Sequence, residues 1–504
     1  MLCVRVCGWI AVISLVLSAA GSWAASDAFY GDLSDTVRDL SGSLPVFPGA
    51  EGFGTATPAG RGGRVVRVVN LNREGEGSLR AALGSSGPRE VVFEVGGIID
   101  LNRDLYIREP FVTVAGQTAP SPGITLIGAG IRVKTHDVLL QHLRIRVGDR
   151  EDGMPPDDRD ALDVEGEPDP KGEAQVFANY ILKHDTDSDG KLTYEEIARY
   201  EKRLTREYFA QVDLNNDGAI TAEDAPPASG AAMIEVYNVV VDHCSMAWGM
   251  DETVSTWNPG VHDITFSNCI IAESLLNSMH SEGPHSKAFL FGDYTKRVAS
   301  IRNLLAHNDD RGPLVKGDVC ALIVNELIYN PGRVAIGFSA PEFKGAVLAD
   351  VIGNVMIPGP STKKGIAYIY VQDDVDPKSR IYAAGNNLGS NPLDLQPAQK
   401  AGEPIVQVKP LTILPAHEVE AFVLEHAGAR PAHRDSVDKR IVDSVRTRTG
   451  RIIDSPSQVG GFPTAEPTHK ALDIPADPEK DSNGDGYTNL EEWLHGLAAK
   501  AEGR

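Results

Sequence analysis

The sequence has little of several features, and each shortage excludes a class of protein. Only five of its 504 residues are cysteine, and two of these, Cys3 and Cys7, lie within the first ten positions. The other three, Cys244, Cys269 and Cys320, are an odd number, so an exported chain keeps at least one unpaired thiol. A disulfide scaffold is therefore excluded, and buried cysteines that behave as small apolar side chains are the expectation.

Positive charge is also scarce. Asp and Glu outnumber Lys and Arg by 70 to 48, and the formal net charge is -22. Such a surface repels nucleic acids and anionic membranes, so we expect neither as a partner. An acidic substrate would need a local cationic site or a bridging metal ion.

Long apolar runs are missing except near the N-terminus. Residues 8–20 are mostly apolar, follow Arg5 and precede small residues around Ala24. This pattern is typical of a signal peptide over residues 1–24, and the run is short for a membrane span; an uncleaved anchor is the alternative. We expect a secreted monomer, extracellular or periplasmic, without a membrane contact after cleavage.

Five segments share one pattern: a polar start, an alternating apolar run, a His or Asn marker, and more apolar residues. They are residues 136–145, 237–246, 262–271, 296–307 and 318–329, with markers His142, His243, Asn268, Asn303 and Asn325. Like segments recurring every few tens of residues are typical of a solenoid whose coils stack. We predict a parallel β-helix with Asn268, Asn303 and Asn325 in an internal hydrogen-bonded ladder; a β-sandwich is the competing architecture.

The spacing of the markers has two further consequences. Cys244 and Cys269 each follow a marker by one residue, so they would lie in adjacent coils about 4.8 Å apart, where a disulfide is one possibility. The step from His142 to His243 is too long for one coil and contains helix formers and acids. We therefore predict an inserted helical module over 166–232, between β-helix parts at 45–165 and 233–390; residues 391–475 receive no assignment.

Three twelve-residue loops match the EF-hand pattern, in which oxygen ligands surround Ca²⁺ and a glycine makes the sharp turn. The expected ligands are Asp185, Asp187, Asp189, Lys191 and Glu196 in the first loop, Asp213, Asn215, Asp217, Ala219 and Asp224 in the second, and Asp481, Asn483, Asp485, Tyr487 and Glu492 in the third, within a C-terminal unit at 476–504. Asp224 is shorter than the usual glutamate, so we expect the second loop to bind more weakly. Solvated acidic turns are the alternative for all three. Because calcium is plentiful outside cells, we interpret the loops as structural staples rather than switches.

Charged residues also gather in four segments of the expected coils: "PPDDRDALDVEG", "VDHCSMAWGMDETVSTW", "GPHSKAFLFGD" and "HNDDRGPLVKG". Residues one coil apart lie side by side in a β-helix, so carboxylates from 158–160 and 251–252 could gather beside Lys287 and Arg311. Converging carboxylates favour a hard cation.

These segments, with "FPGAEGFG", "GRGGRVVRVVNLNREGEGSLRAAL" and "AGQTAPSPGITLIG", resemble the pectate lyases of polysaccharide lyase family 1. The resemblance covers about residues 45–345 around the insert, and an EF-hand insert is similar to that of a subset of the family. It implies a right-handed parallel β-helix with an inserted α-helical EF-hand module and a C-terminal calcium loop. It also implies calcium-dependent cleavage of 1,4-linked α-galacturonan, an acidic polysaccharide, by β-elimination outside the cell.

The resemblance carries roles onto single residues. Arg311 resembles the family's base, and Lys287 and Lys316 resemble its substrate-binding cations. Asp158, Asp160 and Asp251 resemble the ligands of the active-site calcium. The family's next acid falls at Ser255, so either Glu252 substitutes for it or the calcium has fewer ligands.

Other interpretations of the same residues stay open. Arg311 could form a salt bridge to Asp309 or Asp310, and we interpret His285 as a histidine lining the cleft rather than as the base. The chain could also be a lyase or hydrolase of another acidic glycan, because hydrolysis needs paired carboxylates such as Asp158 and Asp251. A non-catalytic, calcium-stapled glycan-binding β-helix is a further possibility.

Overall fold

The computed structural model describes residues 36–152, 154–166, 189–200, 218–221, 235–340, 345–389, 393–394 and 399–504, together with Arg206 and Phe209. The chain divides into two units. The smaller consists of residues 1–26, 167–233 and 341–344, and the larger of residues 27–166, 234–340 and 345–504.

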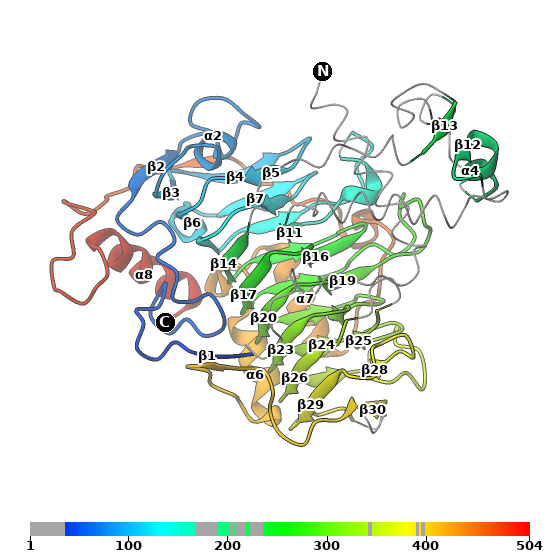
Figure 1. Ribbon diagram of the computed structural model, residues 1–504. Helices are drawn as coiled ribbons and strands as arrows, with labels where there is room; N and C mark the ends of the chain where they lie inside the picture. The colour runs from blue at the N-terminus through cyan, green and yellow to red at the C-terminus, as the bar shows by residue number, and fades with distance from the viewer. Residues whose placement is uncertain are drawn as a thin grey trace. The chain divides into compact units, whose positions relative to one another are not determined.

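Three sheets form the larger unit (Figure 1). The first sheet contains β2 (Arg64–Val68), β3 (Arg89–Phe93), β6 (Val112–Ala115), β9 (Val138–Gln141), β14 (Val236–Asp242), β17 (Val261–Ser267), β20 (Lys296–Ile301), β23 (Cys320–Val324), β26 (Leu348–Ile352) and β29 (Arg380–Ala384). The second contains β4 (Val95–Asp100), β7 (Ile124–Ile127), β10 (Arg144–Arg146), β15 (Ser245–Ala247), β18 (Ile270–Ala272), β21 (Leu304–Ala306), β24 (Leu327–Tyr329) and β27 (Val355–Ile357), with β32 (Thr468–His469) antiparallel beside β4. The third contains β5 (Leu105–Ile107), β8 (Ile131–Val133), β11 (Leu162–Glu165), β16 (Glu252–Trp257), β19 (Lys287–Phe291), β22 (Leu314–Val315), β25 (Ile336–Phe338), β28 (Ile369–Val371) and β30 (Leu393–Asp394).

Successive strands of the chain go to different sheets, so one coil supplies one strand to each. β14, β15 and β16 belong to one coil, and β17, β18 and β19 to the next, and each pairs in parallel with its counterpart. Apolar side chains of all three sheets, such as Val241, Met246 and Phe289, fill the interior. The chain is therefore a parallel β-helix, as the repeated pattern predicts, and the parallel pairing rules out an antiparallel β-sandwich.

The asparagine ladder differs from its prediction. Asn303 lies in a buried row with Glu326, Asn354 and Asn386, in which the Asn354 side chain accepts from the Glu326 amide (2.8 Å) and donates to Asn386 Oδ1 (2.9 Å). The prediction is wrong for Asn268 and Asn325, because they lie one position earlier, at a turn with positive φ (52° and 56°). Asparagine tolerates this backbone conformation, which explains its presence at both positions without a place in the buried row.

Cys244 and Cys269 lie in the predicted column but form no disulfide. Cys244 and Cys269 lie in adjacent coils, where the Ile270 amide donates to the Cys244 carbonyl (2.9 Å). Cys244, Cys269 and Cys320 are all free and buried. Burial raises the pKa of the Cys244 thiol to about 12 and that of Cys320 to about 11, so both are neutral and behave as small apolar groups.

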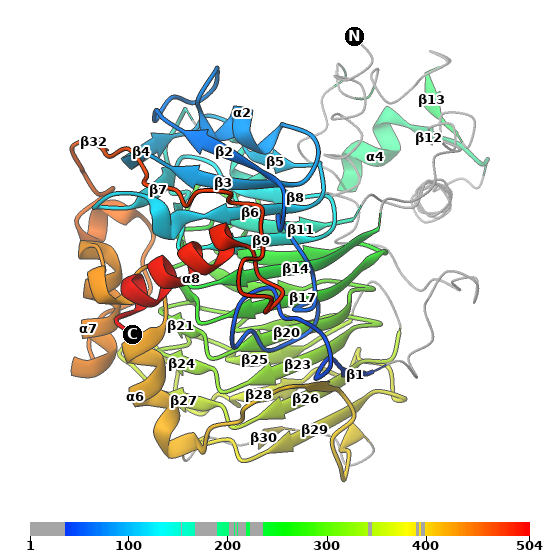
Figure 2. The ribbon, with the colours of Figure 1, turned by 90° about the vertical axis from the view of Figure 1, so that its left-hand side faces the viewer.

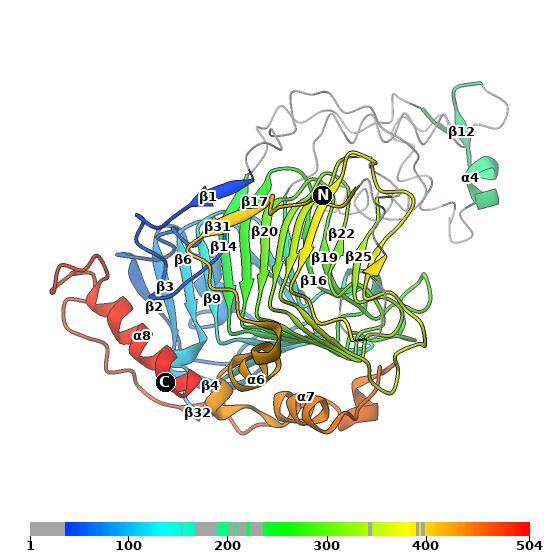
Figure 3. The ribbon, with the colours of Figure 1, turned by 90° about the horizontal axis from the view of Figure 1, so that it is seen from below.

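The C-terminal part of the chain, from residue 410 onward, covers the outside of the coil. Seen from below, α6 (Ala416–His426) and α7 (Ser436–Thr447) lie along one side (Figure 3). Their apolar residues, including Val423 and Ile441, pack against Ile270, Leu304 and Leu327 of the second sheet. β31 (Gln407–Lys409) pairs in parallel with β1 (Val37–Asp39) near the other end of the chain.

Short helices complete the larger unit. α8 (Asn489–Glu502) packs Leu490 and Leu494 against Val92 and Ala115 of the first coils (Figure 2). The others are α2 (Leu79–Leu83), η1 (Gly116–Thr118), η2 (Pro156–Asp158), η5 (Pro431–His433) and η6 (Pro456–Val459). None of the helices within the described parts of the chain combines the length and the apolar character that a membrane span requires.

The described part of the smaller unit contains a helix and a two-stranded ribbon. α4 (Tyr194–Tyr200) directly follows β12 (Leu192–Thr193), which pairs antiparallel with β13 (Ala219–Ile220). Leu192 faces Ile220, and both occupy the eighth position of their EF-type loops. The two predicted loops are thus joined side by side through their β-type positions.

Candidate active site

A row of charged residues crosses the start of the third sheet. β11 pairs Leu162 with Val254 of β16, so Asp160 and Glu252, each two residues earlier in the chain, lie side by side. Glu252 pairs in turn with Lys287, and Lys287 bridges to Asp310. Because neighbouring strands lie about 4.8 Å apart, this register alone brings together residues 150 positions apart in the chain.

Three carboxylates converge at this row. One oxygen each of Asp160, Asp251 and Glu252 lies within 4.8 Å of the other two, and Asp160 Oδ1 accepts the Glu252 amide at 2.8 Å. Burial raises the pKa of Asp160 well above its ordinary value, and the charges of Asp163 and Asp251 raise it further. Buried carboxylates that repel one another provide the donors that calcium requires, so these residues fit the cation that the sequence predicts.

Asp251 differs in its surroundings. Burial acts to raise the pKa of its carboxyl, but contacts with His280 and His285, and then the charges of Lys287 and Arg311, outweigh burial and hold it below the ordinary value. The closest approaches to Asp251 Oδ1 are 3.5 Å for His280 Nε2, 3.3 Å for His285 Nε2 and 3.9 Å for Lys287 Nζ. Asp251 is therefore ionised at neutral pH.

Arg311 reaches the same group from two coils further along the chain. It has a positive φ of 57°, its amide donates to Asp310 Oδ1 (2.7 Å), and its guanidinium forms an ion pair with Glu252. The guanidinium of Arg333 pairs with Asp309 and lies 3.4 Å from Asp310. The structure thus directs Arg311 toward Glu252, rather than into the salt bridge to its own neighbours that was the alternative.

The two predicted substrate cations lie at different places. Lys287 Nζ contacts His285 Nε2 at 2.6 Å, next to the carboxylates. Lys316 is buried, lies 3.5 Å from Asp293 and stacks over the Trp257 ring at 5.4 Å. Since Phe291 pairs with Val315, Lys316 is opposite Gly292, about 16 Å along the strand from Lys287, so the two cations are further apart than one sugar ring.

Asp158, a predicted calcium ligand, and Ser255, at the position of the family's missing acid, have other surroundings. Asp158 is not one of the three converging carboxylates, and its backbone carbonyl accepts from Arg132 Nη2 at 2.7 Å. Ser255 donates its hydroxyl to Asp163, which also pairs with Arg132. The acid that the family pattern expects at 255 is therefore absent, and Glu252 stands among the converging oxygens.

Sequence reasoning missed His280 and gave His285 no role beyond lining the cleft. Both belong to the loop between β18 and β19, and their rings stack with centroids 3.4 Å apart. Two histidines five residues apart, directly before Lys287, are a signal in "HSEGPHSK" that could have indicated this pair.

Of the predicted ligands in the two insert loops, the structure describes Asp189, Lys191, Glu196 and Ala219. Asp189 Oδ1 accepts the Lys191 amide, and Glu196 accepts both the amide and the hydroxyl of Thr193, all at 2.9 Å. The other predicted ligands, Asp185, Asp187, Asp213, Asn215, Asp217 and Asp224, lie outside the described residues.

The C-terminal loop is described in full. Asp481 accepts the amides of Gly484 (2.7 Å) and Gly486 (2.9 Å), and Asp485 accepts that of Tyr487 (2.9 Å). Asn483 Nδ2 lies 2.5 Å from Glu492 Oε1 and 3.2 Å from Asp485 Oδ2, so the predicted ligands already face one another. Backbone hydrogen bonds therefore hold the predicted ligands in an arrangement that fits a calcium loop.

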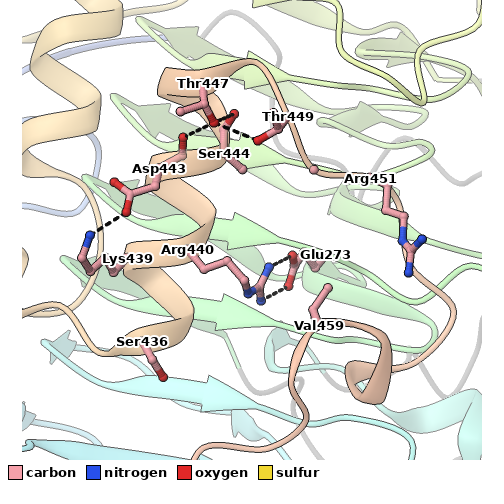
Figure 4. Close-up of a pocket in the computed structure, with 11 residues that line it drawn as sticks. Glu273, Ser436, Lys439, Arg440, Asp443, Ser444, Thr447, Thr449, Arg451 and Val459 are labelled. Carbon is pink, nitrogen blue, oxygen red and sulfur yellow. Dashed lines mark hydrogen bonds and ion pairs between the residues drawn. The ribbon is translucent and has the colours of Figure 1, made fainter.

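A separate pocket of about 710 Å³ lies beside α7 (Figure 4). Its lining includes Arg440, which pairs with Glu273, and Lys439, which pairs with Asp443. Arg451 also lines the pocket, and none of the predicted site residues does, so the pocket is separate from the group of charged residues described above.

Comparison of the sequence with known proteins assigns the chain to a family. A protein of Neosartorya fischeri named "Probable pectate lyase C" is 31% identical over 489 residues, covering 90% of this chain and 94% of its own. The chain belongs to the pectate lyase family. A namesake from Aspergillus flavus is 30% identical over 493 residues, covering 91% of this chain and 95% of its own.

Part of this pectate lyase family member matches a second family, and the chain is also similar to solved structures. The family described as EF hand matches residues 205–224, which include the second insert loop. Among solved structures, the cedar pollen allergen jun a 1 aligns with TM-score 0.45 and 15% identity over 75% of this chain and 92% of its own. A pectate lyase from Bacillus sp. N165 in complex with trigalacturonate aligns with TM-score 0.41 and 14% identity over 76% of this chain and 99% of its own.

Proposed function

We propose that this chain is a secreted, calcium-dependent pectate lyase. It cleaves 1,4-linked α-D-galacturonan by β-elimination and releases unsaturated oligogalacturonates. The observation that carries the proposal is the meeting of Asp160, Asp251 and Glu252 with Lys287 and Arg311 at one row of the third sheet. Membership of the pectate lyase family supports the same chemistry.

Calcium would be held by Asp160, Asp251 and Glu252. When bound, it neutralises the charge that builds on a uronate when the proton next to its carboxylate leaves. Three acids supply fewer than the six to eight oxygens calcium takes, so the substrate carboxylate and water would complete its shell. Asp158 and Ser255 contribute no oxygen to the group of three, which makes the substrate's own oxygens more important here.

The chain's own cations would act on the substrate directly. The ammonium of Lys287 is placed to bind the uronate carboxylate beside Asp251 and to stabilise the developing negative charge. Arg311 is placed to receive the C5 proton once its guanidinium has turned from Glu252 toward the sugar and has given up one of its own protons to water, because a charged guanidinium has no lone pair that can accept a proton. The bond between C4 and its oxygen then breaks as the double bond forms between C4 and C5, and the departing oxygen takes a proton from water.

A hydrolase is the weaker assignment. Glycosidases separate their two carboxylates by about 5–5.5 Å or more to leave room for the sugar or water. Here three carboxylate oxygens lie within 4.8 Å of one another and face two cations, which suits ion binding better than acid–base hydrolysis.

The decisive experiment is the digestion of polygalacturonate by the purified chain. We expect ultraviolet absorbance from unsaturated products that vanishes with EDTA and returns on adding calcium. Cleavage without unsaturated ends would instead show a hydrolase, and binding without turnover would show a non-catalytic glycan-binding protein.

Secretion is part of the proposal and rests on the N-terminal pattern. N-terminal sequencing of the protein exported by its host should begin close to Ala24. A mature protein that retains Arg5 would contradict cleavage.

A further inference from the structure

Two histidines share Asp251 with the calcium group. His280 and His285 are 7% and 2% exposed, and their rings stack at 24° with centroids 3.4 Å apart. Both turn Nε2 toward the same oxygen, Asp251 Oδ1, at 3.5 and 3.3 Å. The three side chains form a group whose ligand atoms lie within 4.8 Å of one another.

These separations resemble those between ligands of one ion more than hydrogen bonds. An N–H···O hydrogen bond is about 2.7–3.2 Å long. Two ligands bound about 2.1 Å from one ion, at angles between the octahedral and tetrahedral values, are themselves about 3.0–3.4 Å apart. The distances from His280 and His285 to Asp251 lie at or just beyond the upper end of that range.

A positive charge already lies against this group. The Lys287 ammonium is 2.6 Å from His285 Nε2 and 3.9 Å from Asp251 Oδ1. An ammonium donates, so His285 Nε2 presents its lone pair, as a metal ligand does. The position of the Lys287 ammonium shows that His285 and Asp251 attract a cation between them.

The surroundings support ligation by His280 as well. Asp157 Oδ1 lies 3.6 Å from His280 Nδ1, and Asp157 is held by the Ser281 amide (2.7 Å) and hydroxyl. A carboxylate behind a ligating imidazole orients the ring and raises its basicity. His280 Nδ1 accepts from the Glu282 amide (3.2 Å), so Nε2 carries the ring proton. Ligation through Nε2 requires that proton to move to Nδ1, toward Asp157, and breaks the Glu282 contact.

We propose that Asp251, His280 and His285 form a second cation site, for a first-row transition-metal dication of the zinc or cobalt class. Two imidazoles and one carboxylate suit such ions, whereas calcium prefers oxygen alone. The site rests on the proposed function only in that it borrows Asp251 from the calcium group. An ion on His285 displaces the Lys287 ammonium, so loading links metal supply to the substrate-binding cation.

Cobalt(II) added to the full chain tests the site, because a histidine ligand gives an imidazole N–H signal that the oxygen-only sites and loops cannot give. Paramagnetic proton NMR should show two solvent-exchangeable, hyperfine-shifted imidazole N–H signals, one for each histidine. His280→Gln and His285→Gln should each remove one signal and weaken cobalt binding about tenfold or more. His417→Gln on α6, with a side chain 80% exposed, is the matched control and should retain both.

The outcomes separate this site from the lyase assignment. Absence of the shifted signals in wild-type protein, or their persistence in both variants, overturns the site. If His285→Gln fails to fold by circular dichroism, His280→Gln alone decides. Calcium-dependent lyase turnover without cobalt signals supports the proposed function and rejects the second cation site. Cobalt signals without turnover support the site and reject the proposed function.

Discussion

Glu252 links the two halves of the catalytic proposal. Its carboxylate belongs to the group of three oxygens suited to calcium and also pairs with Arg311, the proposed base. A cation bound to Glu252 would compete with Arg311 for the same carboxylate. The guanidinium would then be released toward the sugar only when the ion is in place.

Replacing Glu252 with glutamine tests this link. Glu252→Gln removes one charged ligand, so the calcium concentration that supports half-maximal turnover should rise by about tenfold or more. Calorimetric calcium titration of the active-site group measures the same change. Glu418→Gln, an exposed change on α6, should leave both values unaltered, and an unaltered calcium response in Glu252→Gln would contradict its role as a ligand.

Single residues also show where sequence reasoning stops. The markers Asn268 and Asn303 look alike in the sequence, yet one occupies a positive-φ turn and the other the buried row. A shift of one position changes which way a side chain points, and the repeat length does not determine that shift. His280 escaped notice for a related reason, because its partner Asp251 lies in the preceding coil.

The buried row between the first two sheets contains an unusual acid, Glu326. Its Oε1 accepts from Asn303 Nδ2 (3.1 Å), and its Oε2 is buried without a hydrogen-bond partner. Burial raises the pKa of Glu326 from 4.5 to about 8, so it stays protonated in the folded chain at neutral pH.

This acid should make stability depend on pH in a defined direction. The unfolded chain loses the Glu326 proton above about pH 4.5 while the folded chain keeps it to about pH 8, so its contribution is full below 4.5 and is lost as pH rises through 8. Glu326→Gln should remove that loss, of the order of a few kcal/mol, and raise the denaturation midpoint at pH 8 relative to wild type. Equal midpoints for the two proteins at both pH 4.5 and pH 8 would contradict the buried, protonated state.

The helix α7 is joined to the second sheet by buried charges. Asp438 is fully buried, accepts from Arg146 Nη2 (2.8 Å) and Ser245 Oγ (2.7 Å), and lies 3.6 Å from Arg144 Nε. Asp443 on the same helix forms an exposed pair with Lys439 instead.

These two aspartates form a matched pair for mutation. Asp438→Ala leaves Asp435 as the carboxylate facing the guanidinium groups of Arg144 and Arg146 and should lower the free energy of unfolding by about 3 kcal/mol. Asp443→Ala should change it by less than about 0.5 kcal/mol, because exposed ion pairs contribute little. Chemical denaturation of both variants measures the difference, and similar values would show that the network is not responsible for docking α7.

The helices α6 and α7 explain why residues 391–475 received no structural prediction from the sequence. The coils repeat, so their pattern is visible in the sequence, whereas α6 and α7 occur once and repeat nothing. α7 nevertheless carries a helical stripe at Val437, Ile441 and Val445, all buried, which periodicity alone could have identified.

At the scale of the whole chain, calcium in the C-terminal loop would tie distant segments together. The C-terminal loop is anchored where Tyr487 donates its hydroxyl to the Pro45 carbonyl (3.0 Å) and where Glu491 pairs with Arg61 (2.8 Å). An ion in this loop would therefore fix the start of the β-helix as well as α8. The acidic excess of the chain adds a general benefit, because bound cations reduce its self-repulsion.

Thermal unfolding with and without calcium should show this effect. A site filled at one hundred times its dissociation constant stabilises by about 2.7 kcal/mol, so calcium should raise the melting temperature. In Asp481→Asn, calcium should raise the melting temperature by less than in wild type. In Asp473→Asn, an exposed change outside the loop, calcium should raise it as much as in wild type. A full calcium response in Asp481→Asn would show that the loop does not bind the ion.

The central claim is that one row of the β-helix assembles a base, an ammonium and a calcium group for β-elimination. The most direct test is the ultraviolet assay on polygalacturonate at saturating calcium, comparing wild type with Arg311→Lys. We predict unsaturated product from wild type and a kcat lower by about 10²–10⁴-fold in the variant, with folding and calcium binding retained. Equal turnover by the two proteins, or no unsaturated product from wild type, would contradict the claim.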